Sequence, residues 1–353
     1  MKNAQILAHR LTNQHLIGPP MKDAEAVVRH FAAMQAQDYH GAKWAVAQRC
    51  SAQDAALDRL FDEGRILRTH LCRPTWHFVL PEDIRWVLQV TRHRVHQANA
   101  FMGRKQGMDA RLLKKATDLI ARALSGGKHL ERDELMAHLR RARIDTSEFR
   151  STYFLMHAEL EAVICSGPRA GRQFTYALLD ERVPPARTWS DEEGLAELVR
   201  RYFTSRGPAS LQDLTLWSGL TVAEAKRGIA SVQEQFAAVT INGRTHWHPK
   251  DREPLRIPAN TVHLLPNYDE YGIGYKDRSA FHDPAAVPKG RENPVFRNLV
   301  MLNGRLIGTW DRKLGRKSVQ VRTSLLAPCS GAAEQALRKA ERRYAGFLGL
   351  APA

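Results

Sequence analysis

The chain has 353 residues, of which 43% are hydrophobic and 25% charged; this is ordinary for a soluble globular protein of roughly two or three domains. Its 53 Lys and Arg residues against 37 Asp and Glu leave a net charge of +16, so we expect a polyanionic partner, with a basic surface kept for solubility as the alternative. The four cysteines form no CxxC pair and no apolar run approaches the roughly 20 residues of a spanning helix, which argues against a disulfide framework, a cysteine zinc site and a membrane protein.

The first third of the sequence predicts helices followed by a β-hairpin. A short amphipathic stretch, ILAHRLTNQHL, precedes a helix that Asp23 is suited to cap, because apolar residues then recur at helical spacing as far as Ala32. Two further helical pieces are expected around 41–49 and 53–62. Alternating apolar residues in RILRTHLCRPTWHFVL then predict two strands joined by a turn at 72–75. Helices followed by a hairpin are the order of a winged helix.

A second unit of the same kind follows. Helical stretches are expected at about 109–124, 131–142 and 148–163. They lead into VICSGPRAGRQFTYALL, in which two apolar runs flank a loop rich in Gly and Pro. This order predicts a second winged helix.

The third unit gives the clearest local prediction in the chain. LQDLTLWSGLTVAEAKRGIASV predicts two short helices broken at Gly219, with Thr221 as the cap of the second. FAAVTINGRTHWHP then predicts a hairpin with a tight turn at Asn242 and Gly243. For each of the three units, the alternative is generic α+β packing without DNA-binding geometry.

From about residue 255 the pattern changes to short strands and turns. An Asn-Gly pair at 303 and 304 predicts another hairpin, and a helix is expected at about 332–348. We therefore predict a small β-barrel or sheet domain closed by a helix. Between its strands, a basic loop is expected, formed by Arg312, Lys313, Arg316 and Lys317.

These patterns divide the sequence into four predicted domains. Three winged-helix units are followed by the β-rich domain, and the expected boundaries are 1–100, 101–186, 187–254 and 255–353. Two segments rich in Pro and Gly, at 183–187 and 284–294, are the expected linkers or exposed loops.

Common catalytic motifs are absent from the sequence. It contains no GxxxxGK[ST] phosphate loop, no HExxH zinc helix and no GxSxG nucleophile elbow. The H-x-E and P-C-x-x-C elements of a zinc deaminase are also missing. Any chemistry is therefore expected to come from polar side chains without a metal or another cofactor.

Two glutamines follow the first well-defined helix. Gln35 and Gln37 lie where the apolar pattern stops, in FAAMQAQDYHGAKWA. Their amides could end the helix by bonding free carbonyl groups, or they could form a functional site. Asp38 could stabilise a developing positive charge, cap the next helix or pair with an arginine.

Four segments, taken together, carry a family resemblance. MQAQDYHGAKWA, LRTHLCRPTWHFVL, LLPNYDEYGIGYKDR and LNGRLIGTW occur in this order across nearly the whole chain. They resemble the tandem winged-helix DNA glycosylases of the AlkZ type, which are similar to the broader AlkX/YcaQ group. The resemblance implies an α+β fold with three winged-helix units and a small β-barrel or sheet domain, C-shaped around a DNA channel.

The same resemblance implies an activity and a partner. Members of the family hydrolyse the N-glycosidic bond of alkylated purines, here expected to be N7-alkylguanine and N3-alkyladenine, and some unhook interstrand crosslinks. We expect a monofunctional enzyme without metal or other cofactor. Its expected partner is double-stranded DNA carrying alkylated or crosslinked purines, bound by a monomer in the cytoplasm, at the nucleoid, without a membrane.

The family signature falls on Gln35, Ala36 and Gln37. The final glutamine resembles the crosslink-repair branch, whereas Asp at that position marks the other group. Gln37 is the preferred catalytic residue, with Gln35 second. An alkylated purine is cationic and leaves as a neutral base, so no strong acid is needed, and paired amides could hold the attacking water and stabilise the oxocarbenium-like sugar.

Several basic residues are candidates for DNA contacts. Arg73 and His77 match the R-P-T-x-H stretch of the family and could contact a phosphate beside the lesion; hairpin packing is the alternative. Lys276 and Arg278 lie among tyrosines, which suits a nucleic-acid groove or an internal tyrosine network equally. The basic loop formed by Arg312, Lys313, Arg316 and Lys317 is the candidate backbone clamp or groove-inserting hairpin.

The competing hypothesis is a non-catalytic winged-helix protein. A transcription regulator or a lesion-sequestering resistance protein would use LTVAEAKRGIASV as a recognition helix. That segment offers Lys226 and Arg227 but few side chains suited to reading bases. Sequence-specific readout is therefore the less favoured alternative.

Overall fold

The computed structural model describes residues 1–283 and 296–353 and has the mixed α+β character that the sequence predicts. The expected linker at 284–294 lies outside the described residues. Contacts divide the chain into two compact units. The first unit contains residues 1–57, 196–217 and 221–353, and the second contains 58–195 and 218–220.

The second N-terminal helix begins where the sequence predicts. Asp23 caps α2 (Ala24–Phe31), because its side chain accepts a hydrogen bond from the Ala26 N–H at 2.7 Å. The apolar face of α2 is buried, as its helical spacing requires. The neighbouring helices are α1 (Asn3–Asn13), α3 (Tyr39–Cys50) and α4 (Asp54–Asp62).

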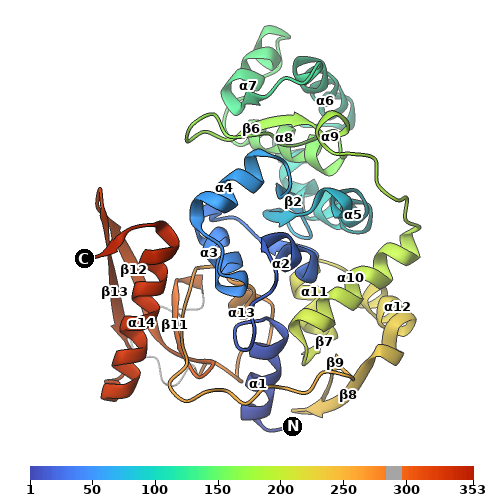
Figure 1. Cartoon of the computed structure of the whole chain (residues 1–353). Coiled ribbons are helices and arrows are strands. Elements are labelled where there is room, and N and C mark those ends of the chain that lie inside the picture. Colours follow the sequence, from blue (N-terminus) through green and yellow to red (C-terminus); the bar gives the residue numbers. More distant parts are fainter. Residues whose placement is uncertain (284–295) are drawn as a thin grey trace. The chain divides into compact units, whose positions relative to one another are not determined.

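The C-terminal part of the first unit is an open sheet covered by a helix (Figure 1). Helix α14 (Gly331–Leu348) packs on the sheet through Tyr344, whose ring centroid lies 5.0 Å from that of Trp310. Neighbouring strands are antiparallel except for the last pair. In sheet order, they are β10 (Val262–Leu265), β11 (Leu299–Leu302), β12 (Arg305–Leu314), β13 (Ser318–Leu325) and β14 (Ala351–Pro352).

Most of the predicted third helix-and-hairpin series lies in the first unit, except for residues 191–195 of its first helix and residues 218–220. Thr221 caps its second helix by accepting from the Glu224 N–H, and Asn242 and Gly243 form the tight turn with positive φ angles of 48° and 72°. The series comprises α10 (Asp191–Arg206), β7 (Ala209–Ser210), α11 (Leu211–Ser218), α12 (Val222–Val232), a 3-10 turn (Gln233–Gln235), β8 (Phe236–Ile241) and β9 (Arg244–Pro249), and its sheet order is β7-β9-β8.

The second unit contains the first two predicted hairpins. Strands β2 (Leu67–Leu71) and β3 (Thr75–Val79) pair antiparallel over their full length, as predicted. The second hairpin forms a sheet of β4 (Leu130–Glu131), β6 (Thr175–Leu178) and β5 (Ile164–Ser166), and the helices are α6 (Ala110–Leu124), α7 (Arg132–Arg141), α8 (Arg150–Leu160) and α9 (Leu179–Arg182).

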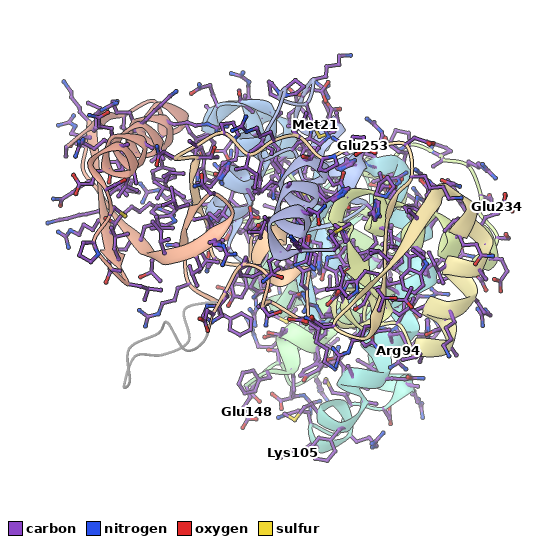
Figure 2. The ribbon with its side chains drawn as sticks, turned by 90° about the horizontal axis from the view of Figure 1, so that it is seen from below. Met21, Arg94, Lys105, Glu148, Glu234 and Glu253 are labelled. Atoms are coloured by element: carbon purple, nitrogen blue, oxygen red, sulfur yellow. The ribbon has the colours of Figure 1, made fainter. Side chains whose placement is uncertain are left out.

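A long helix in the second unit was not predicted. Helix α5 (Pro81–Lys105) has 25 residues and begins with Pro at its first position and acidic residues in its first turn. Figure 2 shows Lys105 at its end close to Glu148, and the Gln106 side chain donates to the Glu148 carboxylate at 3.2 Å. The segment RHRVH, at 92–96, is therefore part of a helix.

Candidate active site

The two glutamines lie in the loop between α2 and α3, and they differ in exposure. Ala32 ends α2 with a positive φ of 62°, and a two-residue strand, β1 (Met34–Gln35), follows. The Gln35 side chain is only 7% exposed, whereas Gln37 is exposed. Of the two glutamines, Gln37 is the residue exposed to solvent.

The buried glutamine supports the exposed one. The Gln35 side-chain oxygen, Oε1, accepts a hydrogen bond from the Gln37 backbone N–H at 3.0 Å. This bond spans two residues and fixes the direction in which the chain leaves the loop. The Gln35 side chain therefore holds the backbone of Gln37 in place.

A buried ion pair holds the other side of the loop. Glu270 in α13 (Glu270–Ile273) accepts from the Gln35 N–H at 2.8 Å through Oε1 and pairs with Arg206 at 2.6 Å through Oε2. Arg206 donates to the Ala33 carbonyl at 3.2 Å. The Trp217 indole N–H adds a third donor to Oε2, at 3.0 Å. The loop therefore depends on side chains that are distant in sequence.

Asp38 caps the helix that follows the glutamines. Its Oδ1 accepts from the Gly41 N–H at 3.1 Å, which is the capping alternative stated for this residue. The positive end of the α3 dipole therefore lies directly after Gln37. Exposed His40, in the first turn, has a pKa lowered mainly by desolvation and then by the charge of Lys43, with Arg312 also contributing.

An open cleft of about 400 Å³ lies beside the first turn of α3. Asn267 lines this cleft, and a Cβ placed on Gly41 would lie 3.2 Å from the Asn267 side-chain oxygen. That oxygen is buried and has no hydrogen-bond partner among the described residues. The remaining lining residues are Phe296, Arg297, Asn298, Thr309, Trp310, Asp311, Arg322, Thr323 and Ser324.

The predicted basic loop is largely a strand. Arg312 and Lys313 belong to β12, where they pair with residues of β13, so only the short turn between the strands is a loop. The expectation of a loop was wrong at Arg312 and Lys313, because the pairing of β12 with β13 continues as far as Leu314 with Val319. The Arg312 guanidinium carbon lies 5.8 Å from the centre of the Tyr344 ring, and desolvation raises the pKa of this tyrosine to about 12. Lys313, Arg316 and Lys317 are exposed.

The tyrosine-rich segment is an internal network. Tyr271 and Tyr275 are fully buried, and their hydroxyl groups donate to backbone carbonyls at 2.9 and 2.8 Å. Lys276 is exposed, whereas Arg278 is half-buried and donates to the Gly272 carbonyl at 3.0 Å. For the two buried tyrosines, the structural alternative is therefore confirmed.

The second unit holds the remaining predicted residues. Arg73 is half-buried in the β2–β3 turn. His77 is buried in β3, where its Nδ1 lies 2.9 Å from the Thr75 carbonyl oxygen. This is the packing alternative for the imidazole, and the predicted DNA contact of these two residues stays a prediction.

Sequence reasoning missed Glu270, Arg206, Trp217 and Asn267. Glu270 lies within a segment that carried the resemblance, yet its partner Gln35 is 235 residues away. Its neighbours in NYDEYGIGYKDR mix tyrosines with charged residues, so no local pattern indicated that this carboxylate is buried and requires a partner.

The described residues contain neither a metal-binding cluster nor a membrane-spanning helix. Within residues 1–283 and 296–353, no group of at least three His, Cys, Asp or Glu side chains is placed to hold a metal ion. In the same part of the chain, no helix combines the length and the apolar character needed to cross a membrane.

The chain is similar to known proteins in sequence and in fold. The family model described as "DNA glycosylase AlkZ-like" matches residues 28–347. A curated relative, "Interstrand DNA cross-link repair glycosylase" from Streptomyces sahachiroi, is 23% identical over 328 residues, which is 87% of each chain. The solved structure of the Streptomyces sahachiroi DNA glycosylase AlkZ superposes with a TM-score of 0.80 at 20% identity, over 100% of this chain and 99% of that one.

Proposed function

Because the chain belongs to the AlkZ-like DNA glycosylase family, we propose that it releases N7-alkylguanine and N3-alkyladenine from double-stranded DNA and unhooks interstrand crosslinks. It acts as a monofunctional enzyme, as a monomer and at the nucleoid. One observation carries the proposal: Gln37 presents an exposed carboxamide from a loop whose backbone is held by buried side chains.

The reaction needs little from the protein because the substrate supplies the leaving group. Alkylation makes the purine cationic, so when the glycosidic bond breaks, its electron pair neutralises the base. Water then forms a new bond from its oxygen to C1′ of the sugar and loses a proton to solvent. The Gln37 side-chain oxygen accepts a hydrogen bond from this water and turns its dipole toward the developing sugar cation.

The two glutamines have different roles in this proposal. Gln37 touches the water, while buried Gln35 is a positioning residue because its Oε1 holds the Gln37 N–H. This division replaces the expectation that both amides hold the water. It follows from burial, since a side chain that is 7% exposed offers little surface to a substrate.

DNA binding is assigned to the exposed cations. Lys276, Lys313, Arg316 and Lys317 are exposed, and the last three project from the β12–β13 hairpin or its turn. Half-buried Arg73 can donate to a phosphate, but buried His77 supports its hairpin instead. Arginine forks and lysine ammonium groups both bind phosphate, and each such contact makes affinity depend on salt.

The decisive experiment measures base release from a duplex that contains one N7-alkylguanine. Gln37→Ala removes the amide, and we expect the single-turnover rate to fall by ~10² to 10³, the usual loss for one preorganised polar contact. Gln335→Ala, at an exposed position on α14, is the matched control and should keep the wild-type rate. Equal background release by wild type and Gln37→Ala would refute the enzymatic proposal.

Two further readouts address the rest of the proposal. Strand breakage should require alkali after base release, since a monofunctional enzyme leaves an abasic site. Selection of one sequence from random DNA, without any base release, would favour the regulator or sequestering protein, which would present exposed Lys226 and Arg227 of α12 to DNA.

A further inference from the structure

We propose that Glu270 is a positioning residue for base release and that, with Arg206, it sets the place of Gln37. The inference rests on the proposed role of Gln37. It concerns residues that share no sequence motif with the glutamines and that do not touch the substrate.

The carboxylate of Glu270 joins two sets of donors. Oε1 accepts from the Gln35 backbone N–H at 2.8 Å, whereas Oε2 accepts from Arg206 Nε at 3.0 Å, from an Arg206 terminal nitrogen at 2.6 Å and from the Trp217 indole at 3.0 Å. The Glu270 and Arg206 side chains are 1% and 0% exposed. Every one of these bonds is therefore sheltered from water, where charged hydrogen bonds are strong and directional.

Arg206 binds carbonyl groups of the same loop, whereas Glu270 binds an N–H group. Its terminal nitrogens donate to the carbonyls of Phe31 at 3.4 Å and Ala33 at 3.2 Å. The ion pair thus binds carbonyls at residues 31 and 33 and an N–H at residue 35. Gln35 then passes the constraint to Gln37 through its side chain. A continuous set of hydrogen bonds runs from the ion pair to the backbone of the proposed catalytic residue.

The loop needs such a constraint because regular structure does not provide it. Of residues 32–38, which lie between α2 and α3, only the two residues of β1 have regular structure. Ala32 adopts a positive φ of 62° with ψ −50°, outside the regions that an alanine favours. A buried ion pair is weak evidence for added stability, since apolar residues of similar volume often serve as well. We therefore attribute to this ion pair a role in fixing the geometry of the loop, and not in adding stability.

The neighbouring residue offers a matched control. Asp269 and Arg49 form a second buried ion pair at 2.9 Å, with 1% and 0% exposure. Arg49 otherwise donates to Gln14 and to the Ala45 carbonyl, away from the loop. Both guanidinium groups lie over the Phe31 ring, at 5.1 Å for Arg49 and 4.9 Å for Arg206. The two pairs therefore match in burial, chemistry and shared core contact. They differ in their other bonds: Glu270 bonds to the loop, whereas Asp269 caps α13 by accepting from the Tyr271 N–H at 2.8 Å, a cap that Asn can keep.

The experiment compares Glu270→Gln with Asp269→Asn in the full chain. In Glu270→Gln, an amide NH₂ faces either the Gln35 N–H or the guanidinium, so one set of donors loses its acceptor. We expect the single-turnover release rate to fall by ~10- to 100-fold, while the Kd for the same duplex stays within about twofold. Asp269→Asn should lose comparable thermal stability and keep the wild-type rate. All rates are measured well below the unfolding transitions and are corrected for the folded fraction.

Arg206→Lys provides a second test if Glu270→Gln folds poorly. Lysine keeps the charge opposite Glu270 but cannot reproduce the fork that reaches Phe31 and Ala33. It should also lower the release rate without weakening DNA binding.

Each result has one meaning. Base release by wild type together with wild-type rates in folded Glu270→Gln and Arg206→Lys would overturn this inference alone. An equal rate loss in Asp269→Asn would overturn it as well, since the effect would then follow stability. If wild type released no base, the proposed function itself would fail, and the inference with it.

Discussion

The loop that carries Gln37 and the hairpin that carries Arg73 are built in different ways. Strands β2 and β3 pair in a continuous register from Leu67 with Val79 to Leu71 with Thr75, so the hairpin shapes itself through its own backbone. The loop has a two-residue strand and depends on Glu270 and Arg206. Under our proposal, a buried ion pair sets the geometry of the loop, whereas the buried side-chain contact beside the hairpin should contribute mainly to stability.

The largest expected effect tests the hairpin side of this comparison. His70 in β2 contacts Glu159 in α8 through its Nδ1, and both side chains are buried. Glu159→Leu leaves the buried imidazole without this hydrogen-bond partner and should lower the free energy of unfolding by about 1 to 3 kcal/mol, as measured by urea denaturation. The release rate per folded molecule should be unchanged. A large rate loss in folded Glu159→Leu would remove the distinction between the two regions.

A smaller effect is expected at Asp38, the cap of α3. Asp38→Ala removes the acceptor of the Gly41 N–H and should cost about 1 kcal/mol of stability, with a modest fall in release rate. Asp38→Asn keeps a good cap and removes the charge, so its rate should stay near that of wild type. Single-turnover assays of the two variants separate capping from electrostatic catalysis. A fall of ~10² or more in Asp38→Asn, similar to the loss of a catalytic polar contact, would assign the carboxylate a direct role.

The smallest effect concerns DNA contacts of the β12–β13 hairpin. Lys313→Ala and Arg316→Ala each remove an exposed cation and should weaken binding of any duplex a few-fold. Each should also reduce the slope of log K against log salt by about 1. Fluorescence anisotropy across a salt series measures both quantities. Lys339→Ala, at an exposed position on α14, is the control. Unchanged slopes in both variants would exclude this hairpin from the backbone contacts.

The parts that sequence predicted well are those set by neighbouring residues. The Asp23 and Thr221 caps and the turn at Asn242 and Gly243 each depend on a few consecutive positions. Helix α5 was missed although Pro81, the acidic first turn and the helical spacing of Ile84, Val87 and Leu88 all marked its first half.

The support of the candidate site could not be predicted in the same way. Glu270 binds Gln35 across 235 residues of sequence, and Arg206 reaches Ala33 across 173. No local pattern encodes such pairs, because chain folding alone brings them together. The position of Gln37 was available from its motif, whereas its exposure and the burial of Gln35 were not.

The capping role of Asp38 has a consequence for fidelity. The carboxylate next to Gln37 in the chain is engaged with the first turn of α3, and a carboxamide has no proton to give to a departing base. An intact purine would have to leave as an anion from such a centre, which is far harder than the departure of a neutral molecule. Under the proposed mechanism, undamaged DNA is spared by its own chemistry, so the enzyme can tolerate adducts of many shapes without endangering the genome around them.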